Sequence, residues 1–333
     1  MVTARPTVCV LSLGGTIAMM PDREDDLARP RFDAADLVRS VPQLADVATI
    51  TTEPVRRSPS AWLVVDDVLA ALVSARRAVD DGAAGVVLTH GTDTLEETAY
   101  LLDLLWDRSE PLVVTGAMRS PNLPGADGPA NLLAAAVTAC AHDARGLGVV
   151  VVLADEVHLA RAVTKSDAQS VATFRSPGWG PVGRVVEGRL RLALRPARTF
   201  APLPEPLAGP VRVPLLEATL GDDGSTLRSV LVDGLPAVVL AGAGAGNVSV
   251  PLADVCSEAV AEGTAVVLAS RTGSGPVLEH SYGYPGSATD LLDRGALSAG
   301  FLPGRKARLL THVLVSAGAD HEALRAQLSA RRQ

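Results

Sequence analysis

The sequence has no excess of positive charge. Its 333 residues carry 37 acidic side chains against 30 lysines and arginines, the formal net charge is −7, and no segment concentrates basic residues. Proteins that bind nucleic acid or anionic lipid do so through basic clusters of that kind. We therefore expect a small-molecule partner and no nucleic acid.

Cysteine is scarce as well. Cys9, Cys140 and Cys256 are odd in number and far apart, so they do not provide the framework of a disulfide-rich secreted domain. We expect buried free thiols, which suit a reducing compartment. No cluster of histidine, cysteine and aspartate has metal-ligand spacing, so no metal is predicted and no other cofactor is expected.

Long apolar runs are missing. No stretch has the length needed to cross a bilayer, and the N-terminal residues lack the charged, apolar and cleavage-site succession of a secretory signal. We expect no membrane association and a cytoplasmic location.

The chain is rich in apolar residues, and its hydrophobic patterns alternate between those of strands and those of helices. Hydrophobic residues make up 47% and charged residues 20%, and the length suits about two domains. The hydrophobic patterns predict strands at 8–13, 86–88, 112–115 and 149–153 and helices at 34–40, 66–78, 95–106 and 130–141. This order indicates an α/β domain whose mostly parallel sheet is flanked by helices.

A proline-rich stretch interrupts this order at residues 196–214, where periodicity is weak. We predict a linker there, between an N-terminal domain at 1–195 and a smaller C-terminal α/β domain at 215–333. Within and just before the smaller domain, the patterns predict strands near 211–216, 237–241 and 265–269 and helices near 250–262, 289–292 and 304–315.

Two threonine-bearing turns follow predicted buried strands, where open α/β sheets place their ligands. In the first, Gly14 and Gly15 let the backbone approach a ligand, and Thr16 supplies a hydroxyl that can act as a nucleophile. The second places Thr92 beside Asp93, before a helix whose backbone N–H groups would face an anionic substrate group. Thr94 and Glu97 have the spacing of a capping box at the start of that helix.

Five segments in order resemble the bacterial-type L-asparaginase and glutaminase-asparaginase family over nearly the whole chain. They are Gly14-Gly15-Thr16-Ile17-Ala18, the run from His90-Gly91-Thr92-Asp93 to Tyr100, Gly116-Ala117-Met118-Arg119, the run from Asp127-Gly128-Pro129 to Leu132, and Thr164-Lys165 with Ala172-Thr173-Phe174. The resemblance implies a large and a small domain, a homotetramer of tight dimers, and active sites shared between neighbouring subunits.

The chemistry that the resemblance implies is hydrolysis of a side-chain amide through a threonine acyl-enzyme. Thr16 is then the nucleophile, and Thr92, Asp93 and Lys165 form a proton relay. Ser60 resembles the serine that binds the substrate α-carboxylate. Gly15, Gly91 and Asn247 are the remaining substrate-binding candidates, with Asn247 at the end of the glycine-rich run 242–247.

Taken singly, these residues also fit structural roles. An isolated Thr16 could bond its own turn, and an isolated Lys165 would usually be a solvated surface residue. We interpret His90 as a packing or backbone-bonding histidine. The run 242–247 lacks the glycine spacing and the acidic residue of a dinucleotide loop.

The chain departs from the family pattern at three positions. Leu27 stands where the family's mobile loop carries a tyrosine, Ala61 follows Ser60 where glutamine is usual, and Ala288 aligns with a glutamate offered by the neighbouring subunit. A buried ammonium without acceptors is costly. We therefore predict a substrate whose α-nitrogen is acylated, blocked or absent, unless Glu279 or Asp93 compensates.

Two alternatives stay open. One is an ordinary cytoplasmic asparaginase, with the preference between asparagine and glutamine undecided, since a methylene discriminates by only ~1–3 kcal/mol. The other is a non-catalytic relative that keeps the fold as an amino-acid-binding or sensor protein.

Overall fold

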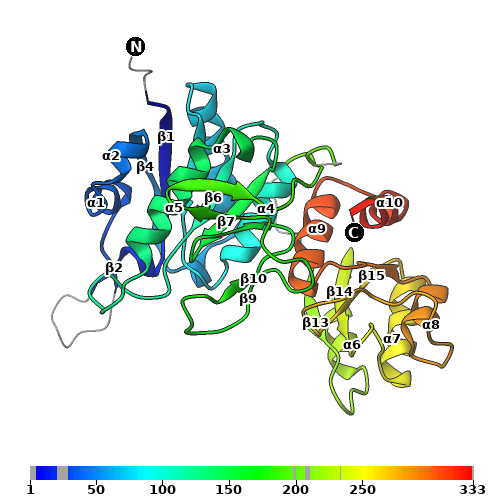
Figure 1. Ribbon diagram of the computed structural model, residues 1–333. Coiled ribbons are helices and arrows are strands. Elements are labelled where there is room, and N and C mark those ends of the chain that lie inside the picture. The colour runs from blue at the N-terminus through cyan, green and yellow to red at the C-terminus, as the bar shows by residue number, and fades with distance from the viewer. Residues whose placement is uncertain (1–4, 21–28, 198–199, 207–210, 233, 332–333) are drawn as a thin grey trace. The chain divides into compact units, whose positions relative to one another are not determined.

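The computed structural model describes residues 5–20, 29–197, 200–206, 211–232 and 234–331 (Figure 1). The chain separates into two units, Met1–Pro202 and Leu203–Gln333. The main sheet of the first unit has eight strands and that of the second has four.

The main sheet of the first unit follows the order β12-β11-β8-β7-β6-β5-β1-β4. Its strands are β1 (Thr7–Gly14), β4 (Thr49–Ser58), β5 (Gly85–Thr89), β6 (Leu112–Thr115), β7 (Val149–Leu153), β8 (Glu156–Leu159), β11 (Gly183–Val186) and β12 (Arg189–Leu192). Pairing is parallel from β4 to β7 and antiparallel from β7 to β12. The predicted α/β fold with a mostly parallel sheet is confirmed.

Helices cover both faces of this sheet. They are α1 (Ala34–Arg39), α2 (Leu44–Val47), α3 (Val65–Asp80), α4 (Leu95–Leu105) and α5 (Gly128–Cys140). Because strand side chains alternate between faces, Val8, Val10 and Val87 share one face, and they form one apolar core with residues of α1, α2 and α5. Helices α3 and α4 pack against the sheet and against each other.

Two short hairpins lie outside the main sheet: β2 (Met19–Met20) pairs with β3 (Arg29–Pro30), and β9 (Thr164–Lys165) pairs with β10 (Phe174–Arg175). Each of these strands has only two residues, so the hairpins depend on contacts with the rest of the unit to hold their position.

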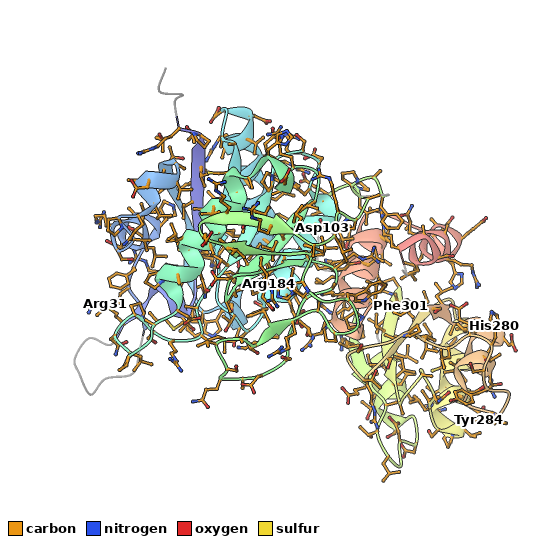
Figure 2. All side chains as sticks on the ribbon, in the orientation of Figure 1. Arg31, Asp103, Arg184, His280, Tyr284 and Phe301 are labelled. Atoms are coloured by element: carbon orange, nitrogen blue, oxygen red, sulfur yellow. The ribbon has the colours of Figure 1, made fainter. Side chains whose placement is uncertain are left out.

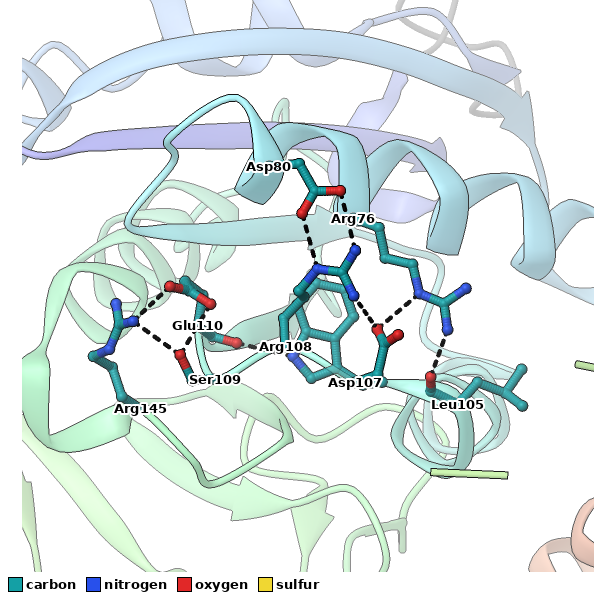
Figure 3. Close-up of polar contacts among 9 residues, drawn as sticks. Arg76, Asp80, Leu105, Asp107, Arg108, Ser109, Glu110 and Arg145 are labelled. Carbon is teal, nitrogen blue, oxygen red and sulfur yellow. Dashed lines mark hydrogen bonds and ion pairs between the residues drawn. The ribbon is translucent and has the colours of Figure 1, made fainter. Parts of the chain in front are cut away.

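Charged side chains tie helix ends and loops together at the amino end of β6. Figure 3 shows Arg76 and Asp80 of α3 bound to Asp107 and Arg108, which follow α4. Nearby, Asp103 of α4, labelled in Figure 2, accepts a hydrogen bond of 2.9 Å from the amide of Val149. These contacts hold the C-terminal parts of α3 and α4 at the amino ends of the strands. The glycine turns lie at the opposite, carboxyl ends, which remain open to a ligand.

The second unit has a fully parallel sheet in the order β13-β14-β15-β16. Its elements are β13 (Leu215–Glu217), α6 (Ser225–Leu231), β14 (Ala237–Gly242), α7 (Val250–Ala261), β15 (Ala265–Ser270), α8 (Ala288–Asp293), β16 (Leu297–Ser298), α9 (Gly304–Ser316) and α10 (His321–Arg331). Residues of α6, α7 and α8 form one core with β14 and β15, and α9 also packs on the sheet. The first strand begins at Leu215, later than the predicted residue 211.

Candidate active site

The two glycine turns meet at the carboxyl ends of neighbouring parallel strands. Strands β1 and β5 pair with Ser12 beside Thr89, so the turns that follow them lie side by side. Gly15 has φ of +92°, and a Cβ at this position would lie 2.2 Å from the Gly91 amide nitrogen. Only glycine fits such a backbone conformation and such a close approach.

Ser60 joins these turns from the other side of β1. It begins a short 3-10 turn, η2 (Ser60–Trp62), just after β4. A Cβ on Gly91 would lie 2.6 Å from the Ser60 hydroxyl oxygen. Ser60 is only 2% exposed, and its hydroxyl has no hydrogen-bond partner among the residues that the structure describes. A buried hydroxyl without a partner is uncommon and calls for an explanation.

The predicted capping box at the start of α4 is wrong, because the Thr94 side chain does not cap the helix. Thr94 does occupy the N-cap position, but its hydroxyl makes no capping bond. It donates instead to the Ser60 carbonyl at 2.9 Å. The threonine therefore links the second turn to the segment that carries Ser60.

Lys165 bridges the two polar residues of the second turn. Its Nζ lies 2.9 Å from Thr92 Oγ1 and 2.9 Å from Asp93 Oδ1. The lysine side chain is 17% exposed and that of Asp93 is 66% exposed. The predicted group of Thr92, Asp93 and Lys165 is thus assembled within one unit, with one side open to solvent.

Thr16 stands directly after the glycine that touches Gly91. It is partly buried at the start of a 3-10 turn, where the Ala18 amide donates to the Gly15 carbonyl at 2.9 Å. Within the described ranges, no hydrogen bond engages the Thr16 hydroxyl or the backbone amides of Gly91, Thr92 and Asp93. An available hydroxyl and available backbone donors are the components of acyl-transfer chemistry.

His90 is fully buried beneath this turn. Its Nδ1 lies 2.6 Å from the Gly91 carbonyl, and because a carbonyl only accepts, Nδ1 is the protonated nitrogen. Burial lowers the pKa of His90 to about 4, so the ring is neutral at pH 7. The interpretation of His90 as a backbone-bonding residue is confirmed.

Sequence reasoning missed Glu96. This carboxylate is 3% exposed on the first turn of α4, and its Oε2 accepts the backbone N–H of Lys165 at 2.6 Å. The sequence offered only a weak signal, an acidic residue in the first turn of the helix that follows Asp93. Its partner could not be identified without the tertiary structure.

Asn247 and Ala288 belong to the second unit. Asn247 is partly buried, and its Oδ1 accepts the Ala288 amide at 3.1 Å. Ala288 is fully buried in the core of that unit, so its methyl does not line open space there. Ala61 is exposed, and Leu27 lies outside the described residues.

Within the described ranges, no three histidine, cysteine, aspartate or glutamate side chains are arranged to hold a metal ion. No helix in that part of the chain combines the length and apolar character needed to cross a membrane.

Comparison with known proteins identifies the family. The family model "Asparaginase, N-terminal" matches residues 7–198, and the model "Glutaminase/Asparaginase C-terminal domain" matches residues 212–328. The chain belongs to the asparaginase family.

Individual asparaginases are similar over nearly the full chain. L-asparaginase 2 of Escherichia coli strain K12 is 34% identical, covering 95% of this chain and 91% of that protein. A probable L-asparaginase of Deinococcus radiodurans is 37% identical, covering 96% of both. The crystal structure of a probable cytoplasmic L-asparaginase from Campylobacter jejuni superposes with a TM-score of 0.85 at 29% identity, over 98% of this chain and 99% of that one.

Proposed function

We propose that the protein is an amidohydrolase that converts the side-chain amide of asparagine, or of an asparagine-like substrate, to the acid and ammonia. The observation that carries this proposal is the meeting of two turns at Gly15 and Gly91: one carries Thr16, whose hydroxyl has no hydrogen bond within the described residues, and the other carries Thr92 and Asp93, both bonded to Lys165. Membership of the asparaginase family supports it. A role restricted to ligand binding would not require a lysine held between a hydroxyl and a carboxylate.

In the proposed reaction, Thr16 Oγ attacks the amide carbon, and its proton passes to the relay. The C–N bond then breaks, the relay returns a proton to the leaving nitrogen, and ammonia departs. An ester between Thr16 and the acyl group remains. Water adds to this ester and releases the acid, which regenerates the hydroxyl.

Lys165 can accept a proton only in its neutral form. The Asp93 carboxylate lies 2.9 Å from Nζ and pairs with the ammonium that forms when the lysine takes up the proton. Thr92 touches the same nitrogen and offers a path along which the proton can move. We propose that these three residues act as one base and acid.

Substrate recognition is proposed to use the hydroxyl and the backbone donors that have no hydrogen-bond partner among the described residues. The Ser60 hydroxyl and the amides near the N-terminus of α4 are suited to a carboxylate and to the oxyanion that develops during attack. Gly15 and Gly91 keep these groups accessible because they leave no side chain in the way. Asn247 is proposed as an additional substrate-binding residue.

The substrate α-nitrogen is proposed to be acylated, blocked or absent. Ala61 is exposed next to Ser60, which leaves room for an N-acyl or peptide group. Ala288 gives no such room within its own unit because it is buried in the core. The proposal of a blocked or absent α-nitrogen therefore depends on Ala61.

We further propose a homotetramer of tight dimers in the cytoplasm. Trp62 and Val64, just beyond Ser60, are 72% and 58% exposed in the single chain, which is consistent with coverage by another subunit. Light scattering after size exclusion should give four times the 34.3 kDa chain mass. Cell fractionation tests the proposed location. Burial raises the pKa of Cys140 to about 11 and that of Cys256 to about 12, so both thiols stay protonated at pH 7.

The function is tested by ammonia release from free L-asparagine, L-glutamine, N-acetyl-asparagine and a short asparagine peptide, with Thr16→Ala and Lys165→Met as controls. Release from free asparagine that Thr16→Ala abolishes and Lys165→Met reduces to a small residual rate would establish an ordinary asparaginase. Release only from the blocked amides would establish the altered specificity. No release from any of the four would contradict the hydrolytic proposal.

A further inference from the structure

The lysine of the relay is carried by a weak element. Strand β9 has two residues, and among the described residues it pairs with β10 alone, so no strand of the main sheet supports it there. Bonds within the hairpin connect its two strands, including Ser166 N–H to the Thr173 carbonyl at 2.9 Å and Ser166 Oγ to the same carbonyl at 2.7 Å. The hairpin is thus internally ordered but needs an external attachment.

Glu96 provides that attachment on the side of Lys165. In an antiparallel pair, successive N–H groups point to opposite sides of the strand. Ser166 N–H points to β10, so Lys165 N–H points to the outer edge, where no strand of this two-stranded sheet lies. The Glu96 carboxylate occupies this edge and accepts the N–H at 2.6 Å.

Lys165 is therefore held at both ends by one short segment of the chain. Its backbone N–H bonds Glu96, and its Nζ bonds Thr92 and Asp93. The distance from backbone to Nζ is set by the length of the lysine, so the attachment at Glu96 determines where Nζ comes to rest against the second turn.

We propose that Glu96 is a positioning residue that places Lys165 Nζ between Thr92 and Asp93, through its bond to the lysine backbone rather than through its charge. This inference rests on the proposed function, because it assigns a role within the same relay. Glu96 acts through Lys165 and does not touch the substrate.

Two substitutions distinguish the length of the Glu96 side chain from its charge. Glu96→Gln removes the charge but keeps an acceptor oxygen at the same distance, whereas Glu96→Asp keeps the charge and withdraws the oxygen by one methylene. We expect Glu96→Asp to lower kcat for the best amide substrate on the order of 10–100-fold with little change in KM, and Glu96→Gln to stay close to wild type. Equal losses in the two variants, or a larger loss in Glu96→Gln, would overturn the proposal.

A double-mutant cycle tests whether the effect passes through Lys165. Glu96→Asp should slow the residual reaction of Lys165→Met far less than it slows the wild type, since no Nζ is left to misplace. An equal loss in both backgrounds would show a general structural role. Glu97→Gln, in the same helix turn, controls for the interaction of acidic charge with the helix N-terminus.

Hydrogen exchange gives a readout that does not depend on activity. The Lys165 amide should lose protection in Glu96→Asp and keep it in Glu96→Gln. If the wild type releases no ammonia but this exchange pattern appears, the proposed function fails and the contact stands. If the wild type is active and the protection of this amide is the same in both variants, the positioning role fails.

Discussion

At the scale of single residues, the choice between lysine and arginine is informative. Lys165 and Lys306 are the only two lysines in the sequence, and arginine carries the other basic charges. Arginine stays protonated in proteins and therefore cannot take up a proton, whereas lysine can. A lysine at position 165 fits a role in proton transfer better than a role as a fixed charge.

Lys165→Arg tests this distinction. The guanidinium can still pair with Asp93, but it cannot accept the proton of the attacking hydroxyl. We expect kcat to fall by about 10²–10⁴-fold, the usual contribution of general acid–base catalysis, while KM changes little. Steady-state kinetics on the preferred amide measures both, and a kcat near that of the wild type would exclude Lys165 as the base.

Ser60→Ala should separate stability from binding. The Ser60 hydroxyl is buried without a partner in the described part of the chain, and such a group costs about 1–3 kcal/mol. The alanine variant should be at least as stable as the wild type in urea unfolding, yet bind substrate more weakly, with a higher KM. A destabilised variant with unchanged KM would assign Ser60 a purely structural role.

His90 makes the stability of the first unit depend on pH. Its pKa is lowered from the usual 6.5 to about 4 in the folded state, so the unfolded state binds the proton first as the pH falls. The contribution of neutral His90 to the free energy of unfolding is complete above pH 6.5. It is lost as the pH falls towards 4, by up to about 1.4 kcal/mol per pH unit. His158 and His312 have lowered pKa values of the same sign, also caused by burial.

Urea unfolding of His90→Asn at pH 7, 6 and 5 checks this dependence. Tryptophan fluorescence follows the first unit, because Trp62, Trp106 and Trp179 all lie in it. The free energy of unfolding should fall less steeply with acid in His90→Asn than in the wild type. Equal slopes would show that His90 titrates normally in the folded protein.

The site was only partly predictable at this scale. Thr16, Thr92 and Asp93 follow apolar strands, and that local pattern pointed to the end of the sheet. Glu96 could not be recognised, because its partner Lys165 is 69 residues away in the chain. The actual partner of Thr94 was missed for the same reason, since its bond to Ser60 spans 34 residues.

At the scale of elements, buried parallel strands were predicted best. The patterns gave 112–115 and 149–153, the ranges of β6 and β7, because every side chain in these strands is apolar or β-branched and buried. Strand β4 was missed because most of its side chains are exposed or half-buried and include Pro54. The antiparallel strands β8, β11 and β12 were missed too, being short and mixed in polarity.

The contact between the two turns predicts a sharp difference between two glycine substitutions. Gly15→Ala would place a Cβ 2.2 Å from the Gly91 nitrogen, so one of the turns must move. Gly82 has a similar φ of +97°, but a Cβ there meets nothing within 4 Å. We expect Gly82→Ala to cost about 1–2 kcal/mol of stability with activity retained, and Gly15→Ala to lose activity.

Thermal unfolding and ammonia release of both variants provide the comparison. Similar activities in Gly15→Ala and Gly82→Ala would mean that the approach of the two turns is not needed for function.

At the scale of the whole molecule, the large and the small α/β units were both predicted from the order of their elements. The proposed linker at 196–214 remains a prediction. The sequence placed Asn247 in the C-terminal domain, and the structure describes it there, bonded to Ala288. Whether a neighbouring subunit completes the site depends on assembly, and no local pattern in the chain determines how copies associate.

The central claim is that Thr16 forms a covalent bond to the acyl group. The most direct measurement is mass spectrometry of the protein after reaction with a slow substrate or an electrophilic asparagine analogue, followed by peptide mapping. The account predicts an acyl adduct on the peptide that contains Thr16, absent from Thr16→Ala. An adduct on Thr92 instead, or hydrolysis that persists in Thr16→Ala, would contradict it.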